Sequence, residues 1–175
     1  MSRILTISVI AIGGLSLLAC SSDPSTQDDT TRDSTGNVVD GGDLGVFKLQ
    51  VGDCIDVTAV TGTSEDETEV GEFDAIPCDE PHTGEVILVA DDHFADVEEY
   101  SSITDLSEQG SDACITAIDE YTGTVFEESN FNVLPLVPTE ASWDSLDDRG
   151  LVCIGVTLDD SLTDIVETSE SIRAA

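Results

Sequence analysis

Four cysteines after residue 50 constrain the fold of this 175-residue chain more than any other feature. They are Cys54, Cys78, Cys114 and Cys153. An even number of widely spaced cysteines is typical of two disulfides formed in an oxidising compartment. Three pairings are possible, and we favour Cys54–Cys78 with Cys114–Cys153 because each bridge would then tie neighbouring segments. Each bridge would stabilise the fold by roughly 3–4 kcal/mol.

A zinc site is the alternative use of these thiols. The chain has no Cys-x-x-Cys spacing, and its two histidines, His82 and His93, are far apart. Its acidic runs also lack the spaced ligands, central glycine and final glutamate of a calcium-binding loop. The sequence therefore predicts no metal site and no cofactor.

The amino terminus has the pattern of a lipoprotein export signal. Arg3 precedes an apolar run over residues 4–18, which is shorter than the roughly 20 residues that cross a bilayer. The run ends in Leu-Leu-Ala-Cys, and a small residue before Cys20 suits an enzyme that lipidates this thiol and then cuts ahead of it. Residues 1–19 should be removed, and Cys20 should anchor the protein on the extracytoplasmic face of the membrane. The alternative is ordinary signal cleavage, with Cys20 an incidental thiol.

Low apolar content separates both ends of the mature chain from its middle. Residues 20–45 are rich in Ser, Thr, Asp and Gly, so they cannot bury enough surface to offset the entropy of ordering, and we expect a disordered acidic tether. Residues 161–175 are acidic and only weakly amphipathic, which predicts a loose tail. The folded domain should therefore span residues 46–160.

Short apolar runs within this middle part predict an α+β fold. The branched residues Val86–Val89 are typical of a buried strand, and Pro135 indicates an edge strand. One main helix is expected over Ser111–Tyr121, with Gly123 as its stop, and residues 138–150 should form a loop. We expect this helix to pack on a small antiparallel sheet of four or five strands. The candidate strands are residues 46–51, 54–57, 73–78, 85–89, 132–137 and 151–158.

The charge of the chain limits its partners. Thirty-eight acidic residues stand against five basic ones, and the formal net charge is −33. Such a surface repels nucleic acid and anionic lipid head groups. It attracts cations or basic partners, or it is simply solvated on a secreted domain.

Several short motifs occur in a fixed order along the chain. They are Gly52-Asp53-Cys54, Pro77-Cys78, Pro81-His82, Glu85-Val86, Ala113-Cys114, Tyr121-Thr122-Gly123, Pro138-Thr139, Ser142-Trp143, Asp148-Arg149 and Cys153. This ordered set resembles the septum formation family of actinobacterial envelope proteins, which join a membrane attachment to a small extracytoplasmic domain with cysteines. The acidic insert Ser64–Glu69 and the longer turn Ser145–Asp147 depart from the family pattern. The resemblance implies a role at the division septum or cell wall, without a defined reaction.

His82 is the first candidate for chemistry. With Glu80 beside it and Glu85 three residues on, its ring could act as a general base. No Gly-x-Ser-x-Gly nucleophile motif accompanies it, however, and the cysteines are better used in disulfides. The structural interpretation is a ring nitrogen bonded to a carboxylate or to a turn carbonyl after Pro81.

Trp143 and Arg149 form the second candidate, since both residue types are frequent anchors in binding sites. An exposed pair could grip a glycan or a peptide. Alternatively, Trp143 covers the core and Arg149 pairs with Asp147 or Asp148. We favour the structural interpretation.

These features predict a non-enzymatic binding or structural module of the cell envelope. The expected partners are the membrane, through the lipid on Cys20, and cell-wall or division proteins, but no nucleic acid. The alternatives are an envelope hydrolase that uses His82 and a cation-responsive lipoprotein.

Overall fold

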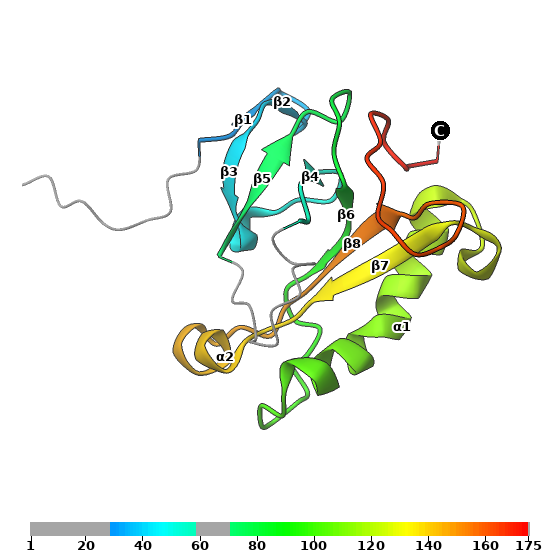
Figure 1. Cartoon of the computed structure of the whole chain (residues 1–175). Helices are drawn as coiled ribbons and strands as arrows, with labels where there is room; N and C mark the ends of the chain where they lie inside the picture. Colours follow the sequence, from blue (N-terminus) through cyan, green and yellow to red (C-terminus); the bar gives the residue numbers. More distant parts are fainter. Residues whose placement is uncertain (1–28, 59–70, 175) are drawn as a thin grey trace, which may run out of the picture.

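A six-stranded antiparallel sheet with the strand order β3-β5-β4-β6-β8-β7 forms the body of the molecule (Figure 1). The computed structural model describes residues 29–58 and 71–174. The strands are β3 (Gly42–Gly45), β4 (Cys54–Ile55), β5 (Glu72–Ile76), β6 (Gly84–Ala90), β7 (Phe131–Leu136) and β8 (Leu151–Thr157). The α+β class is confirmed, whereas the expected number of four or five strands was too low.

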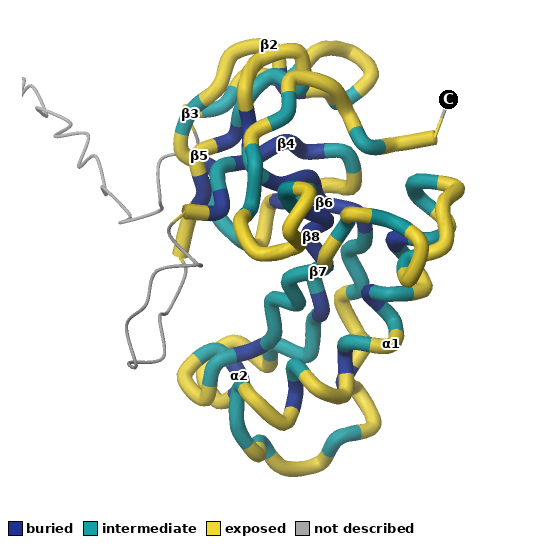
Figure 2. The backbone as a smooth tube through the Cα atoms, turned by 45° about the vertical axis from the view of Figure 1, so that its right-hand side comes forward, coloured by how far each residue is buried: buried dark blue, intermediate teal, exposed yellow. Residues whose placement is uncertain are grey.

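Strands β6 and β8 separate two apolar clusters because successive side chains of a strand point to opposite faces. Val86 and Ile154 belong to the cluster that β3, β4 and β5 complete. Ile87 and Cys153 belong to the cluster that lies under the main helix. The buried stretches of β4, β6 and β8 meet at the centre of the fold (Figure 2).

The main helix, α1 (Ile103–Thr122), covers the β7 side of the sheet (Figure 1). The Ser102 hydroxyl accepts the first free amide, that of Asp105, at 3.1 Å, and Gly123 ends the helix in the left-handed conformation. The helix therefore begins earlier than the expected Ser111. Gly110 lies inside the helix, where glycine is usually unfavourable. A Cβ at this position would lie 2.9 Å from Leu151 Cδ1, so glycine permits close helix–sheet packing.

A second helix, α2 (Glu140–Leu146), occupies the segment expected to be a loop. Thr139 and Ser142 form a capping box that satisfies the first backbone amides, which explains how so short a helix is held. The edge position predicted from Pro135 is confirmed, because β7 is the last strand of the sheet. Two single 3₁₀ turns, η1 (Val46–Lys48) and η2 (Phe126–Glu128), complete the helical elements, and η1 replaces the strand expected at 46–51.

Residues 29–45 are ordered, which differs from the tether expected as far as residue 45. They form β1 (Thr31–Arg32), β2 (Val38–Asp40) and β3, and they bury Val38 and Leu44. The Arg32 guanidinium forms an ion pair with the buried carboxylate of Asp53. The ion pair with Asp53 and the burial of Val38 and Leu44 therefore order residues 29–45, although most of these residues are polar.

Within residues 29–58 and 71–174, no helix combines the length and the apolar character needed to cross a membrane. Cys20 and the acidic insert Ser64–Glu69 lie outside the described residues.

The packing of Gly84 gives a direct test of this fold. A Cβ at Gly84 would lie 2.6 Å from Val57 Cγ1 and 2.8 Å from Ile154 Cγ2, and both methyls belong to stiff β-branched side chains. We expect Gly84→Ala to lower the free energy of unfolding by about 1–3 kcal/mol in denaturant titrations. Gly71→Ala is the control, because apart from its chain neighbours no atom of the described residues lies within 4 Å of the added methyl. Equal stability of the two variants would contradict this packing.

Candidate functional site

The two disulfides have the favoured pairing, Cys54–Cys78 and Cys114–Cys153, with Cα–Cα distances of 5.3 and 5.4 Å. Cys114–Cys153 joins α1 to β8, and both of its residues are fully buried. Cys54–Cys78 joins β4 to the turn after β5. Here Cys54 is fully buried, whereas Cys78 is partly exposed.

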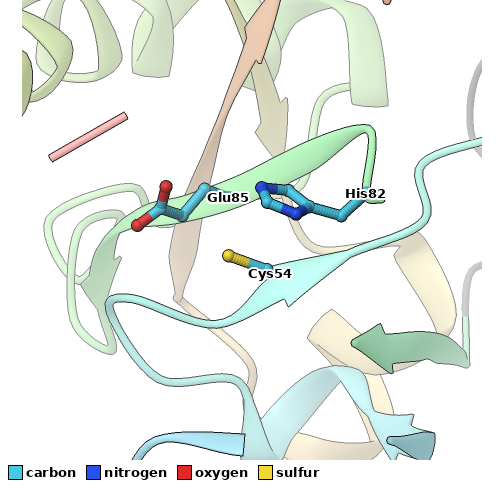
Figure 3. Close-up of side chains that lie close together, drawn as sticks. All are labelled: Cys54, His82 and Glu85. Atoms are coloured by element: carbon cyan, nitrogen blue, oxygen red, sulfur yellow. The ribbon is translucent and has the colours of Figure 1, made fainter. Parts of the chain in front are cut away.

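His82 and Glu85 lie beside Cys54 at the start of β6 (Figure 3). One ring nitrogen of His82, one carboxylate oxygen of Glu85 and the sulfur of Cys54 all lie within 4.8 Å of one another. All three residues are at most 2% exposed. Two titratable groups therefore share a closed space with one sulfur of a disulfide.

The His82 ring is held in one tautomer. Its Nδ1 lies 2.8 Å from the backbone oxygen of Glu80. A carbonyl only accepts, so Nδ1 carries the proton and Nε2 presents a lone pair. Nε2 is buried and has no hydrogen-bond partner in the described part of the chain. The structural interpretation expected a bond to a carbonyl after Pro81, and the acceptor found is the carbonyl of the residue before it.

The Glu85 carboxylate accepts three hydrogen bonds. Its Oε1 accepts from the hydroxyls of Tyr121 and Ser171, the latter at 2.7 Å, and its Oε2 accepts from the amide of Ile172 at 2.8 Å. Sequence reasoning identified Glu85 but none of these donors, which lie 36 to 87 residues away. The sequence did indicate that such donors exist, because an acidic residue at the start of a buried apolar strand needs hydrogen-bond donors. It did not indicate which residues supply them.

The C-terminal segment, residues 158–174, covers this site and is not a loose tail. His82 and Thr168 exchange two backbone hydrogen bonds of 2.9 Å. The amide of Ala174 donates to the Tyr121 carbonyl at 2.8 Å, and the Arg173 guanidinium lies 4.8 Å from the centre of the Tyr121 ring. Figure 1 shows this segment folding back beside β8. Backbone pairing, which composition does not reveal, orders it.

The existing bonds of Cys54 and Glu85 limit the reactions in which this cluster can take part. The sulfur of Cys54 is bonded to Cys78, and the oxygens of Glu85 are engaged with three donors. The trio therefore does not offer a set of free ligands in the oxidised protein. A hydrolytic base at His82 would need a path from solvent to a ring that is 1% exposed. The atom that remains without a hydrogen-bond partner is His82 Nε2, on a ring that has one nitrogen within 4.8 Å of a disulfide sulfur.

Trp143 and Arg149 form a separate cluster near α2. Trp143 is 4% exposed, with the Arg149 guanidinium stacked 3.6 Å from its ring centre. The guanidinium also donates to the carbonyls of Trp143 and Asp148 and pairs with Asp147 at 3.3 Å. This placement favours the structural interpretation of the pair over the binding one, because the Trp143 face is already covered.

The titration of Tyr121 tests the geometry around Glu85. Burial raises the pKa of Tyr121 well above its usual value, and so do the hydrogen bond to Glu85 and the negative charge of that carboxylate. Because the phenol binds its proton more tightly in the folded state, its stabilising contribution is complete below the unfolded pKa of about 10 and is lost as pH rises through the folded pKa. Ultraviolet titration should therefore show one of the two tyrosines ionising late.

Tyr121→Phe should abolish that late ionisation. It should also lower the free energy of unfolding by roughly 1–3 kcal/mol, since it removes a donor from a buried charge. Tyr100→Phe, at the only other tyrosine, is the matched variant and should leave the late component in place. An ordinary phenol titration in the wild type would contradict the arrangement.

Comparisons with known proteins place this domain in a family. No match was found among curated proteins or among solved structures. The family model described as septum formation matches residues 18–175. The matched region contains both disulfides, the His82–Glu85 cluster and the C-terminal segment that covers it. This chain belongs to the septum formation family.

Proposed function

We propose that this chain is a lipid-anchored module on the outer face of the cell membrane that binds a basic partner at the division septum. The observation that carries the proposal is the family match over residues 18–175, which indicates a division-related role in the envelope and includes Cys20. The two disulfides support the outer face, because such bridges persist in oxidising compartments.

The distribution of charge supports a basic partner. The three arginines of the described residues interact within the domain: Arg32 with Asp53, Arg149 with Trp143 and Asp147, and Arg173 with Tyr121. With five Lys and Arg against 38 Asp and Glu, most acidic side chains of the chain have no basic side chain to pair with. Complementary potentials steer association, and screening by salt weakens them. Binding of the partner should therefore weaken as ionic strength rises.

A binding role without hydrolysis is the simpler proposal, because the candidate base His82 is enclosed by the C-terminal segment. The hydrolase alternative requires this segment to leave, and an unchanged phenotype of His82→Ala in cells would remove it. The cation-responsive alternative requires saturable binding heat with Ca²⁺ in calorimetry.

The anchor is tested by replacing Cys20. We expect Cys20→Ala to carry no acyl chains and to retain residues 1–19, because cleavage follows lipidation of this thiol, and intact-mass measurement checks both. Ser22→Ala is the control and should be both cleaved and lipidated. Cleavage of Cys20→Ala ahead of residue 20, with release from the membrane, would contradict the anchor.

The septal role is tested with a tagged copy and crosslinking in living cells. We expect enrichment at the division site and a crosslinked partner with a basic surface. Without the crosslinker, co-purification of this partner should fall as the salt concentration is raised. An even distribution around the cell would contradict the proposal.

A further inference from the structure

The two disulfides differ in what surrounds their sulfurs. Cys114 and Cys153 are both fully buried and belong to the apolar cluster under α1. Cys54 instead lies within 4.8 Å of a histidine nitrogen and a carboxylate, and its partner Cys78 is partly exposed. One bridge thus joins two fully buried residues in the core, whereas the other joins a buried cysteine beside polar groups to a partly exposed cysteine.

The unpartnered Nε2 of His82 is the second observation. A buried polar atom without a hydrogen bond costs roughly 1–3 kcal/mol, so a hydrogen-bond partner at Nε2 would be stabilising. Nδ1 faces the Glu80 carbonyl, so Nε2 is the ring nitrogen left without a partner among the described residues. One ring nitrogen lies within 4.8 Å of both the Glu85 carboxylate and the Cys54 sulfur.

We propose that Cys54–Cys78 is a redox-active disulfide that oxidises dithiols of extracytoplasmic proteins, with Cys78 as the sulfur attacked and Cys54 as the leaving sulfur. His82 is the positioning residue that stabilises the Cys54 thiolate. This activity goes beyond partner binding at the septum and does not depend on it.

The exchange balances as follows. A thiolate of the dithiol attacks Cys78 Sγ, a new S–S bond forms, and the electron pair of the broken bond goes to Cys54 Sγ. The proton lost by the attacking thiol passes to solvent, while the His82 ring stabilises the Cys54 thiolate until this sulfur takes up a proton. The second thiol of the dithiol then loses its proton and attacks the dithiol sulfur that is bonded to Cys78. This step closes the dithiol's own disulfide and releases Cys78 as a thiolate, which takes up a proton. Two electrons thus pass from the dithiol to the protein.

The surroundings of Cys78 are suited to attack from outside. Cys78 lies in a turn closed by the bond from the Glu80 amide to the Pro77 carbonyl at 2.8 Å. A groove lined by residues of β2 and β5 also includes Pro77 and Glu80, which flank this cysteine in the sequence, although Cys78 itself does not line the groove. Asp40, Asp74 and Glu80 line the groove, so a dithiol carried by a basic segment should be preferred over an anionic thiol.

The test is graded reduction of the oxidised full chain with dithiothreitol, followed by alkylation and peptide mass spectrometry of each cysteine. We expect Cys54–Cys78 to open at least about tenfold faster than Cys114–Cys153 in the folded protein. We expect His82→Asn to slow the opening of Cys54–Cys78 by about tenfold and to leave Cys114–Cys153 unchanged, because asparagine keeps a donor for the Glu80 carbonyl but has no basic nitrogen. His93→Asn, at the exposed second histidine, is the matched control and should change neither rate.

Equal rates for the two bridges, or an unchanged rate in His82→Asn, would overturn the proposal. If His82→Asn does not fold, the wild-type protein is treated with a monothiol, and the cysteine that carries the mixed disulfide is identified by peptide mass spectrometry. The adduct is expected on Cys78, and an adduct on Cys54 would overturn the assignment of the attacked sulfur.

Discussion

The buried carboxylate of Glu85 is the interaction on which the arrangement of the site depends. An isolated charge in a protein interior is costly, and each hydrogen bond to it offsets part of that cost. Here the three donors come from the end of α1 and from residues 171 and 172, while Glu85 itself lies in β6. One carboxylate therefore connects the sheet, the helix and the C-terminal segment. The enclosure of His82 follows from this connection, because the same segment pairs with the His82 backbone.

Much of the sheet could be predicted because its strands are short apolar runs between turn residues. The strands near 73–78, 85–89, 132–137 and 151–158 were predicted in this way, and both disulfides connect neighbouring elements as expected. Residues 29–45 could not be predicted, since their order depends on a salt bridge from Arg32 to Asp53. The start of α1 was misjudged because Ser111 was interpreted as the start of the helix, whereas Gly110 lies inside it and permits close packing against Leu151.

The candidate site was predictable in its residues but not in its surroundings. His82 and Glu85 stand out in the sequence as polar groups at the edge of an apolar strand, and the structure brings them together with Cys54. Tyr121, Ser171 and Ile172 contact Glu85 only through the fold, so no local pattern indicates them. Trp143 and Arg149 were identified as a pair by their closeness in sequence, and they do stack, but in a separate cluster near α2.

The position of Cys114–Cys153 also determines when the chain is oxidised. Both sulfurs lie under α1, where no enzyme can reach them once the helix has settled on β8. The thiols must therefore meet their oxidant before α1 packs on β8, while the polypeptide is still open. A cell that delays oxidation would trap a closed domain with two thiols inside it, and maturation would require the core to unfold again.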